Sequence, residues 1–299
     1  MSATAVKNVK KRILLIVCAA AALVLVALAL LFLLHPRFLY RRFLIADTVS
    51  SWFDKAEMQT VSPETVSVAA EELQKDSRIR TDNSLLLVRK GYALPADYQD
   101  RVVLQEYRET GLLMEENLIA PFSVLSQQIL EKFDKKLLIT SAYRTAEEQQ
   151  QAIAEEGDLA AGVGESEHQA GLALDVAVKG YGGASFLKTD VGRYLNRNAW
   201  RYGFIIRYPY YGTEQTGISY EPWHIRYVGQ PHATLIARNR LTLESYLDSL
   251  TPGTFYAYGD WLISLQPIGE SYRFPAEYES LTVSPDNRGN LLFTFTVKD

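Results

Sequence analysis

The sequence predicts an α+β protein with an apolar helix at its N-terminus, a middle region of mixed helices and strands, and a small β-rich appendage at its C-terminus. The run from Ile13 to Leu34 contains no charged residue. Between residues 83 and 250, helical and alternating apolar spacings follow one another. From residue 251 onward, aromatic and strand-like segments dominate. These patterns divide the chain into a tail (1–12), an apolar helix (13–34), a spacer (35–82), a folded domain (83–250) and the appendage (251–299).

The apolar helix is long enough to cross a membrane. About 22 residues at about 1.5 Å each span a hydrocarbon core of roughly 30 Å. The small residues in Ala27-Leu28-Ala29 would suit signal-peptide cleavage, but Leu30 to Leu34 continue the apolar run beyond them. We therefore expect a retained single-pass anchor that holds the chain in a lipid bilayer through residues 13–34.

Charges on both sides of this anchor bear on its orientation. The short tail carries Lys7, Lys10, Lys11 and Arg12, which favours a cytoplasmic N-terminus. Three arginines on the other side, Arg37, Arg41 and Arg42, oppose this inference. Charge alone therefore leaves the orientation open.

Composition excludes several classes of function. The formal charge of the 299-residue chain is −4, and it becomes −8 without the four basic residues of the tail. An acidic surface disfavours nucleic acid as a partner, because phosphate contacts need a basic footprint. Cys18, the single cysteine, lies inside the apolar run. The rest of the chain can therefore form no disulfide, zinc–cysteine cluster or thiol nucleophile.

The spacer mixes arginines with aromatic and aliphatic residues at helical spacing. Such a helix could lie against lipid headgroups. A stalk helix that packs on nothing specific is the favoured interpretation.

The folded domain begins with strand and helix patterns. Leu85 to Val88 reads as a buried strand, and residues 113–133 carry apolar side chains on one wide helical face. A short strand, 137–140, then leads to Ser141-Ala142-Tyr143-Arg144. Thr145 and Glu148 have the spacing of a capping box, so a helix should run from there to Glu156. Arg144 is thus expected at a rigid strand-to-helix junction.

The second half of the domain alternates in the same way. Residues 172–178 read as a strand on which Asp175 shares a face with Gly171 and Ala173, so space remains beside the carboxylate. Further elements are expected as helix 191–202, strands 203–209 and 225–228, a helix from Pro231, a helix over 241–250, and a final hairpin whose turn at 285–290 leads into 291–297.

Two segments carry groups that could hold a metal. The chain has four histidines, and two of them, His168 and His224, stand at short offsets from carboxylates. Together with Asp175 they would give zinc two imidazoles and one carboxylate, with the fourth position open to water. Glu221 would then be the general base. Arg144 could stabilise an oxyanion or bind a substrate carboxylate.

Each of these features alone has an ordinary explanation. A histidine seven residues from an aspartate is usually a surface coincidence, and an arginine before a helix is usually a solvated salt-bridge partner. A structural zinc site would normally have a fourth protein ligand. His35 and His232 are assigned no role at the site.

Several motifs in order resemble the VanY-type D-alanyl-D-alanine carboxypeptidases, a group of the LAS zinc peptidases. They are Ser141-Ala142-Tyr143-Arg144, Ser166-Glu167-His168-Gln169 with Asp175, Tyr202-Gly203-Phe204 with Arg207-Tyr208-Pro209, and Glu221-Pro222-Trp223-His224. The resemblance covers roughly residues 83–250. It implies a small α+β domain whose antiparallel sheet, flanked by helices, holds the metal.

The resemblance also implies roles for individual residues. His168, Asp175 and His224 look like the Zn²⁺ ligands, Glu221 like the catalytic base, and Arg144 like the residue that stabilises the transition state or the substrate. Ser166, Gln149, Gln169 and Tyr208 look like substrate-pocket positions. The implied enzyme removes the terminal D-alanine from peptidoglycan stem peptides. We also expect the chain to be monomeric. Because that substrate lies outside the cytoplasm, the catalytic domain is expected on the outer face of a bacterial membrane.

Two other functions remain open from the sequence. An L,D-carboxypeptidase would trim tetrapeptide stems with the same metal chemistry. A non-catalytic cell-wall sensor could keep the fold, although it would have no use for Glu221. Product analysis would separate the two peptidases, and metal analysis would identify a sensor.

Overall fold

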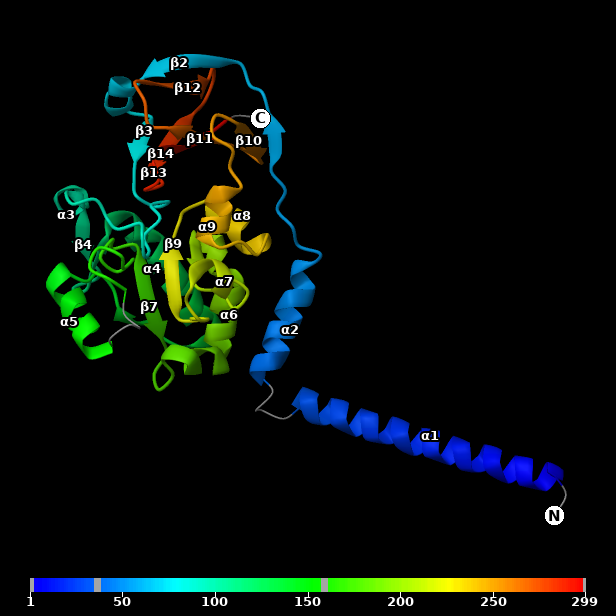
Figure 1. The fold of residues 1–299 in the computed structure, drawn as a ribbon. Helices are drawn as coiled ribbons and strands as arrows, with labels where there is room; N and C mark the ends of the chain where they lie inside the picture. The colour runs from blue at the N-terminus through cyan, green and yellow to red at the C-terminus, as the bar shows by residue number, and fades with distance from the viewer. Residues whose placement is uncertain (1–2, 35–38, 157–160, 298–299) are drawn as a thin grey trace. The chain divides into compact units, whose positions relative to one another are not determined.

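The computed structural model describes residues 3–34, 39–156 and 161–297 (Figure 1). The chain forms two compact units, Met1–Ser50 and Ser51–Asp299. Part of the predicted spacer, residues 35–38 with His35 and Arg37, lies outside the described residues.

The first unit is helical. Helix α1 spans Ala3–Leu34, and its segment Leu15–Phe32 has a mean hydropathy of 3.1. Its apolar side chains from Leu15 to Leu31 are exposed, as expected for a helix that would be surrounded by lipid. A helix of this kind near the N-terminus fits a membrane anchor and a signal sequence equally well. Helix α2, Leu39–Ser51, follows.

A four-stranded antiparallel sheet lies at the centre of the second unit. Its strands run in the order β6 (Leu138–Ser141), β7 (Ala173–Ala177), β9 (His224–Tyr227) and β8 (Phe204–Ile206). Figure 1 labels the two middle strands, β7 and β9. Asp175 of β7 stands directly opposite His224 of β9. This mixed α+β arrangement agrees with the predicted fold class. Two residues 49 positions apart in sequence become neighbours through this register.

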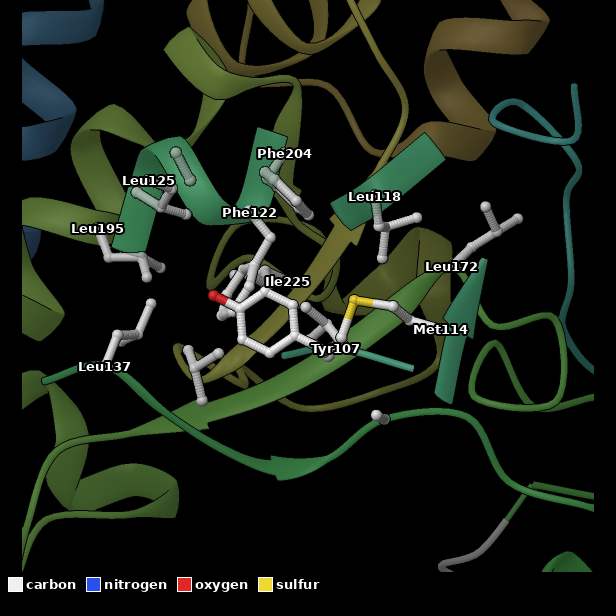
Figure 2. Packing of buried hydrophobic residues seen from close by; sticks show 14 of the residues in the cluster. Tyr107, Met114, Leu118, Phe122, Leu125, Leu137, Leu172, Leu195, Phe204 and Ile225 are labelled. Atoms are coloured by element: carbon white, nitrogen blue, oxygen red, sulfur yellow. The ribbon is translucent and has the colours of Figure 1, made fainter. Parts of the chain in front are cut away.

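A hydrophobic core packs against this sheet. Helix α4, Glu116–Phe133, contributes Leu118, Phe122, Leu125 and Ile129, all of them buried. Strand β7 contributes the alternate residues Leu174 and Val176, with Leu172 just before it. Figure 2 shows Phe122 between the side chains of Tyr107 and Phe204, and its ring makes edge-to-face contacts with both. Because the leucines of β7 point into this core, Asp175 points to the opposite face.

The remaining helices and a hairpin surround the sheet. They are α3 (Tyr98–Arg101), hairpin β4 (Leu104–Glu106) and β5 (Leu113–Glu115), α5 (Ala146–Glu156), α6 (Asp190–Asn198), α7 (Thr213–Thr216), α8 (His232–Arg238) and α9 (Leu243–Asp248). The predicted capping box is confirmed, because the Glu148 amide donates to Thr145 Oγ1 and the Thr145 amide donates to the Glu148 carboxylate. The helix predicted over 113–133 begins three residues later, after strand β5.

The C-terminal segment forms a sheet together with part of the predicted spacer. The order is β1 (Gln59–Val61), β10 (Phe255–Tyr258), β11 (Trp261–Pro267), β14 (Asn290–Thr296), β13 (Ser280–Pro285) and β3 (Ile79–Thr81). Strand β2 (Thr65–Ala69) pairs with β12 (Ser271–Pro275). The predicted hairpin is confirmed as β13–β14.

The expectation of a stalk helix that packs on nothing specific is wrong beyond residue 59. Strands β1, β2 and β3 are hydrogen-bonded to β10, β12 and β13. The reason lies in the local sequence, since Thr65-Val66-Ser67-Val68 alternates β-branched and small polar residues in a pattern that suits a strand. The helical prediction rested on the aromatic residues in the first half of the spacer, and this strand pattern lies in its second half.

The segment Leu85 to Val88 is buried as expected, but it is not a strand. Its amides are satisfied individually: the amide of Leu85 donates to Ser284 Oγ, and that of Leu87 donates to the carbonyl of Asp286. Leu86 and Val88 belong to the core of the central sheet, whereas Leu85 and Leu87 belong to a second core shared with β11 and β14. The alternating pattern therefore arises because successive side chains pack into two different cores, and not because the segment pairs with a strand of a sheet.

Candidate metal centre

His168 lies in a tight turn that precedes β7. The amides of Gln169, Ala170 and Gly171 donate to the carbonyls of Ser166, Glu167 and His168 in turn. Gly171 closes the turn with φ of 69°, in the left-handed region that glycine adopts without strain. The turn sets the buried His168 ring next to β7.

The other two candidate ligands come from adjacent strands. His224 Nδ1 lies 3.0 Å from Asp175 Oδ1, and His168 Nε2 lies 3.4 Å from Asp175 Oδ2. One nitrogen or oxygen of each residue lies within 4.8 Å of the others. The two imidazole rings meet edge to face, with centroids 5.0 Å apart. His168 and Asp175, seven residues apart, thus converge with the distant His224, as the motifs predicted.

Contacts on the far side of each ring indicate which nitrogen is available. His168 Nδ1 lies 2.8 Å from the carbonyl oxygen of Ala142, so Nδ1–H donates there and Nε2 keeps its lone pair toward Asp175. His224 has the opposite arrangement: Nδ1 faces Asp175, and Nε2 faces Glu167 Oε2 at 3.7 Å. Each ring can therefore offer one unprotonated nitrogen to a shared cation.

The electrostatics of this group suit a divalent cation. Burial raises the pKa of Asp175, but the neighbouring His168 and His224 lower it further, to well below its usual range. Burial lowers the pKa of His224, and Asp175 and Glu167 raise it by more, to about 9. Within the described chain, Asp175 Oδ1 is buried without a hydrogen-bond donor. Two imidazoles and an ionised carboxylate match the donor set of an open zinc site.

Glu221 stands at the edge of this group. Its carboxylate oxygen Oε2 lies 3.8 Å from His224 Nδ1, and its side chain is 28% exposed. The amide of Glu221 donates to the carbonyl of Tyr208, and the amide of His224 donates back to the carbonyl of Glu221. This turn fixes Glu221 beside the candidate ligands and leaves its carboxylate within reach of solvent.

Arg144 follows β6 and leads into α5. Its backbone amide donates to the carbonyl of His168, so the arginine is tied directly to the ligand turn. One guanidinium nitrogen donates to Gln149 Oε1 at 3.0 Å, and another lies 3.4 Å from Ser141 Oγ. Gln149 is buried, and its own amide nitrogen donates to the carbonyl of Ala161. Both ends of the Gln149 amide are thus engaged, and the residue holds Arg144 in place.

The other predicted pocket residues lie around the ligand turn. Ser166 begins the turn and is buried. Gln169 is also buried, and its Oε1 accepts from the amide of Gly164. The ring of Tyr208 packs against that of His224 with centroids 5.0 Å apart, and burial raises the pKa of its hydroxyl. Tyr208 thus contacts a candidate ligand directly, whereas Gln169 braces the neighbouring loop.

A cluster of buried charges beneath His224 was missed by the sequence reasoning. Glu167 accepts from both Arg207 and Arg226, and Arg207 also binds Glu244 through two hydrogen bonds. Both guanidinium groups are completely buried. A signal existed, because Arg207 and Arg226 interrupt apolar strands, and a buried charge needs a partner.

Comparison with known proteins places this site in a family. The model of the family "VanY: D-alanyl-D-alanine carboxypeptidase" matches residues 112–230, which include all the candidate residues above. A D-alanyl-D-alanine carboxypeptidase of Enterococcus faecium is 34% identical over 204 residues, covering 63% of this chain and 63% of that protein. The match thus spans just under two thirds of that relative. A D-alanyl-D-alanine carboxypeptidase of Enterococcus faecalis is 34% identical over 63% of this chain and 73% of that protein.

Two solved structures are also similar. The vancomycin-resistance D,D-dipeptidase VanXYg, in complex with a D-Ala-D-Ala phosphinate analogue, has a TM-score of 0.62 and 25% identity over 79% of this chain and all of that chain. A D,D-pentapeptidase VanY from a VanB-type resistance cassette, solved with Zn(II), is 35% identical over 55% of this chain and 98% of that chain, with a TM-score of 0.49. On the sequence matches and the convergence of His168, Asp175 and His224, this chain belongs to the VanY family of D-alanyl-D-alanine carboxypeptidases.

Proposed function

We propose that this chain removes the terminal D-alanine from peptidoglycan stem peptides by hydrolysis. His168, Asp175 and His224 would be the zinc ligands, and Glu221 the general base. The observation that carries this assignment is the convergence of the three ligands within 4.8 Å, with the Glu221 carboxylate 3.8 Å from one of them. A purely structural site would have no need for an adjacent, partly exposed carboxylate.

Zinc, when bound, lowers the pKa of a water to about 7 and polarises the scissile carbonyl. Glu221 then accepts a proton from the attacking water and returns it to the amine of the departing D-alanine. The turn that joins Glu221 to Tyr208 and His224 keeps its carboxylate in one position for both transfers.

Arg144 provides the positive charge of the site. Its guanidinium is oriented by Gln149 and Ser141, and its backbone is tied to His168. From this position it stabilises the negative charge that develops on the carbonyl oxygen, or it binds the terminal carboxylate of the peptide. Tyr208, which packs against His224, and Ser166, which begins the ligand turn, are further pocket residues. Gln149 holds Arg144, and Gln169 braces the loop before the turn.

The location follows from the chemistry and the N-terminal helix. Leu15–Phe32 is apolar and long enough to cross a bilayer. A retained anchor with its basic tail in the cytoplasm would place residues after 34 on the outer face, where stem peptides occur. Release of the domain by signal cleavage would leave the same enzyme free in the wall.

The decisive experiment compares the wild type with Glu221→Gln, both as full-length chains in detergent. Pentapeptide and tetrapeptide stems are supplied as substrates, and released D-alanine is measured by mass spectrometry together with zinc content. We expect about one zinc per chain in both proteins. Loss of the general base should lower the hydrolysis rate of the variant by about 10²–10⁴-fold. Glu214→Gln, an exposed carboxylate on the nearby helix α7, is the matched control and should retain full activity.

Three results would overturn the assignment. Undiminished turnover in Glu221→Gln would remove Glu221 from the mechanism. A wild-type chain without zinc would favour the cell-wall sensor. Cleavage of the tetrapeptide stem in place of the pentapeptide would identify an L,D-carboxypeptidase.

A further inference from the structure

Glu167 is a buried carboxylate whose two oxygens have different surroundings. Oε1 accepts from Arg207 Nε and from Arg226 Nη1, each at 2.7 Å. Oε2 has no hydrogen-bond partner among the described residues, although it is completely buried. His224 Nε2 lies 3.7 Å from Oε2. His224 Nε2 is likewise buried and without a hydrogen-bond partner in the described chain.

The two unsatisfied atoms are chemically complementary. A neutral imidazole that gives the lone pair of Nδ1 to a metal carries its proton on Nε2. His224 Nδ1 faces Asp175 at 3.0 Å, so Nε2–H points away from the metal group and toward Glu167. A metal-bound histidine commonly donates this second N–H to a carboxylate, which fixes the ring orientation and strengthens the ligand.

We propose that Glu167 is the positioning residue of His224, accepting a hydrogen bond from Nε2–H and thereby fixing Nδ1 as the metal-binding atom. This inference rests on the zinc site proposed above. It adds a role for a residue that touches neither the metal nor the substrate.

The surrounding charges hold Glu167 in this orientation. Arg226 follows His224 by two residues on β9, and its guanidinium also donates to the carbonyls of Ser84 and Leu86. The amide of Arg207 donates to the carbonyl of His224, and its guanidinium is held by Glu244. The two arginines that bind Glu167 are thus attached to the strands around His224. A shift of the carboxylate would require both arginines to move.

A purely structural role would explain less of this geometry. If Glu167 only neutralised two buried arginines, its two oxygens could each take one guanidinium. Instead, Oε1 accepts from both arginines, and Oε2 is left facing His224.

The test compares Glu167→Gln with Glu244→Gln in the full-length chain in detergent. Glutamine keeps the shape of glutamate, but it must turn an NH₂ group either to the arginines or to His224 Nε2–H, where two donors would meet. Glu244→Gln weakens the same buried cluster without touching His224, so it is the matched control. Both substitutions should lower the thermal midpoint, so thermal stability alone cannot distinguish the two roles.

Zinc affinity is measured by competition with a chromophoric chelator. We expect Glu167→Gln to bind zinc about 10- to 100-fold more weakly than the wild type. Glu244→Gln should weaken zinc binding much less, because Arg226 still holds the Glu167 carboxylate beside His224. An equal effect in the two variants, or none in Glu167→Gln, overturns the positioning role while leaving the zinc site itself intact. A wild type that binds no zinc overturns the proposed function instead.

A second measurement needs no Glu167 variant and decides the matter if Glu167→Gln fails to fold. Imidazole ¹H–¹⁵N spectra of the zinc-loaded chain, assigned with a His224→Gln variant, report which nitrogen of His224 carries the proton. A downfield Nε2–H signal, shielded from exchange with solvent, supports the proposal. A metal-bound Nε2 or an exchanging N–H refutes it.

Discussion

The protonation of His224 makes the affinity of the site for metal depend on pH. Two carboxylates raise its pKa to about 9 in the metal-free chain, so the ring is mainly protonated at neutral pH. A metal ligand must be neutral, and zinc therefore has to displace this proton. The raised pKa makes metal binding pH-dependent in a range where an ordinary histidine would already be neutral.

We expect the apparent zinc affinity to rise as pH increases from 7 to 9, by up to about tenfold per unit, because the competing proton becomes easier to remove. Above pH 9 this dependence should disappear. Chelator competition at several pH values measures the slope, and calorimetry in buffers of different ionisation enthalpy measures the proton released. An affinity that stays constant between pH 7 and 9 would contradict the raised pKa.

Arg144 should be sensitive even to a change that keeps its charge. Lysine has no planar fork, so it cannot contact Gln149 and Ser141 while also presenting donors to an oxyanion. We expect Arg144→Lys to lower kcat/KM by about 10²–10³-fold, the usual cost of losing one well-placed oxyanion donor. Discontinuous assays of D-alanine release at several substrate concentrations measure this change in kcat/KM. Arg101→Lys, in an exposed ion pair with Asp97, is the control and should change little.

At the scale of single residues, the sequence predicted the three candidate ligands that the structure brings together, but not the residues that support them. His168, Asp175 and His224 could be predicted because metal ligation demands particular residue types, and their motif spacing is specific. Glu167 lies inside the same motif, yet its role depends on which atoms its carboxylate faces. That orientation follows from Arg207, just after β8, and Arg226, on β9. Tertiary contacts of this kind leave no periodic signal in the sequence.

The turn between the first two ligands depends on Gly171. Its φ is 69°, and a Cβ at this position would lie 2.9 Å from Leu104 Cδ2 and 3.1 Å from the amide nitrogen of Glu115. The hairpin β4–β5 therefore lies directly against the turn that presents His168. A side chain here would meet both an unfavourable backbone conformation and a neighbouring strand.

Gly171→Ala should destabilise the chain through both effects. The left-handed backbone costs about 1–2 kcal/mol in the free energy of unfolding, and overpacking adds about 1–3 kcal/mol. Gly253→Ala is the matched control, because Gly253 has φ of 79° but open space around it, so only the backbone cost applies. Denaturant unfolding of both variants gives the difference. Equal losses in the two would show that the β4–β5 hairpin yields freely to the added methyl group.

Helices and strands were predicted correctly where a local pattern in the sequence was unambiguous. The strand containing Asp175 and the helix after Thr145 follow from alternation and a capping box, both of which are local signals. The Leu85 to Val88 segment misled because alternating burial also arises when a single stretch of chain passes between two cores. The amides of Leu85 and Leu87 donate to Ser284 and Asp286, about 200 residues away, so no local pattern could reveal these bonds.

Across the second unit, the segment from residue 251 is structurally joined to the catalytic region. Ile263, Leu265 and Leu292 of its strands pack in one core with residues of α8 and α9, among them Leu235 and Leu247. His232 of α8 lies between Tyr246 of α9 and Thr294 of β14, within 3 Å of both hydroxyls. The sequence indicated a β-rich C-terminal segment correctly. It could not indicate this shared core, because apolar strand residues do not specify which partner they face.

A substitution at Leu292 can show whether this shared core stabilises the metal site. The side chain is completely buried in β14, among residues of both the six-stranded sheet and the helices α8 and α9. Leu292→Ala should lower the free energy of unfolding by about 2–5 kcal/mol, because it removes buried methyl groups and leaves a cavity. Ile268→Ala, exposed in the same segment, should change it by no more than about 0.5 kcal/mol. In the Leu292 variant, zinc release and loss of tertiary structure should occur in a single transition at lower denaturant concentration, because one core serves both regions. If the strands beyond residue 251 unfold first while zinc and D-alanine release persist, the two regions are energetically independent despite their contacts.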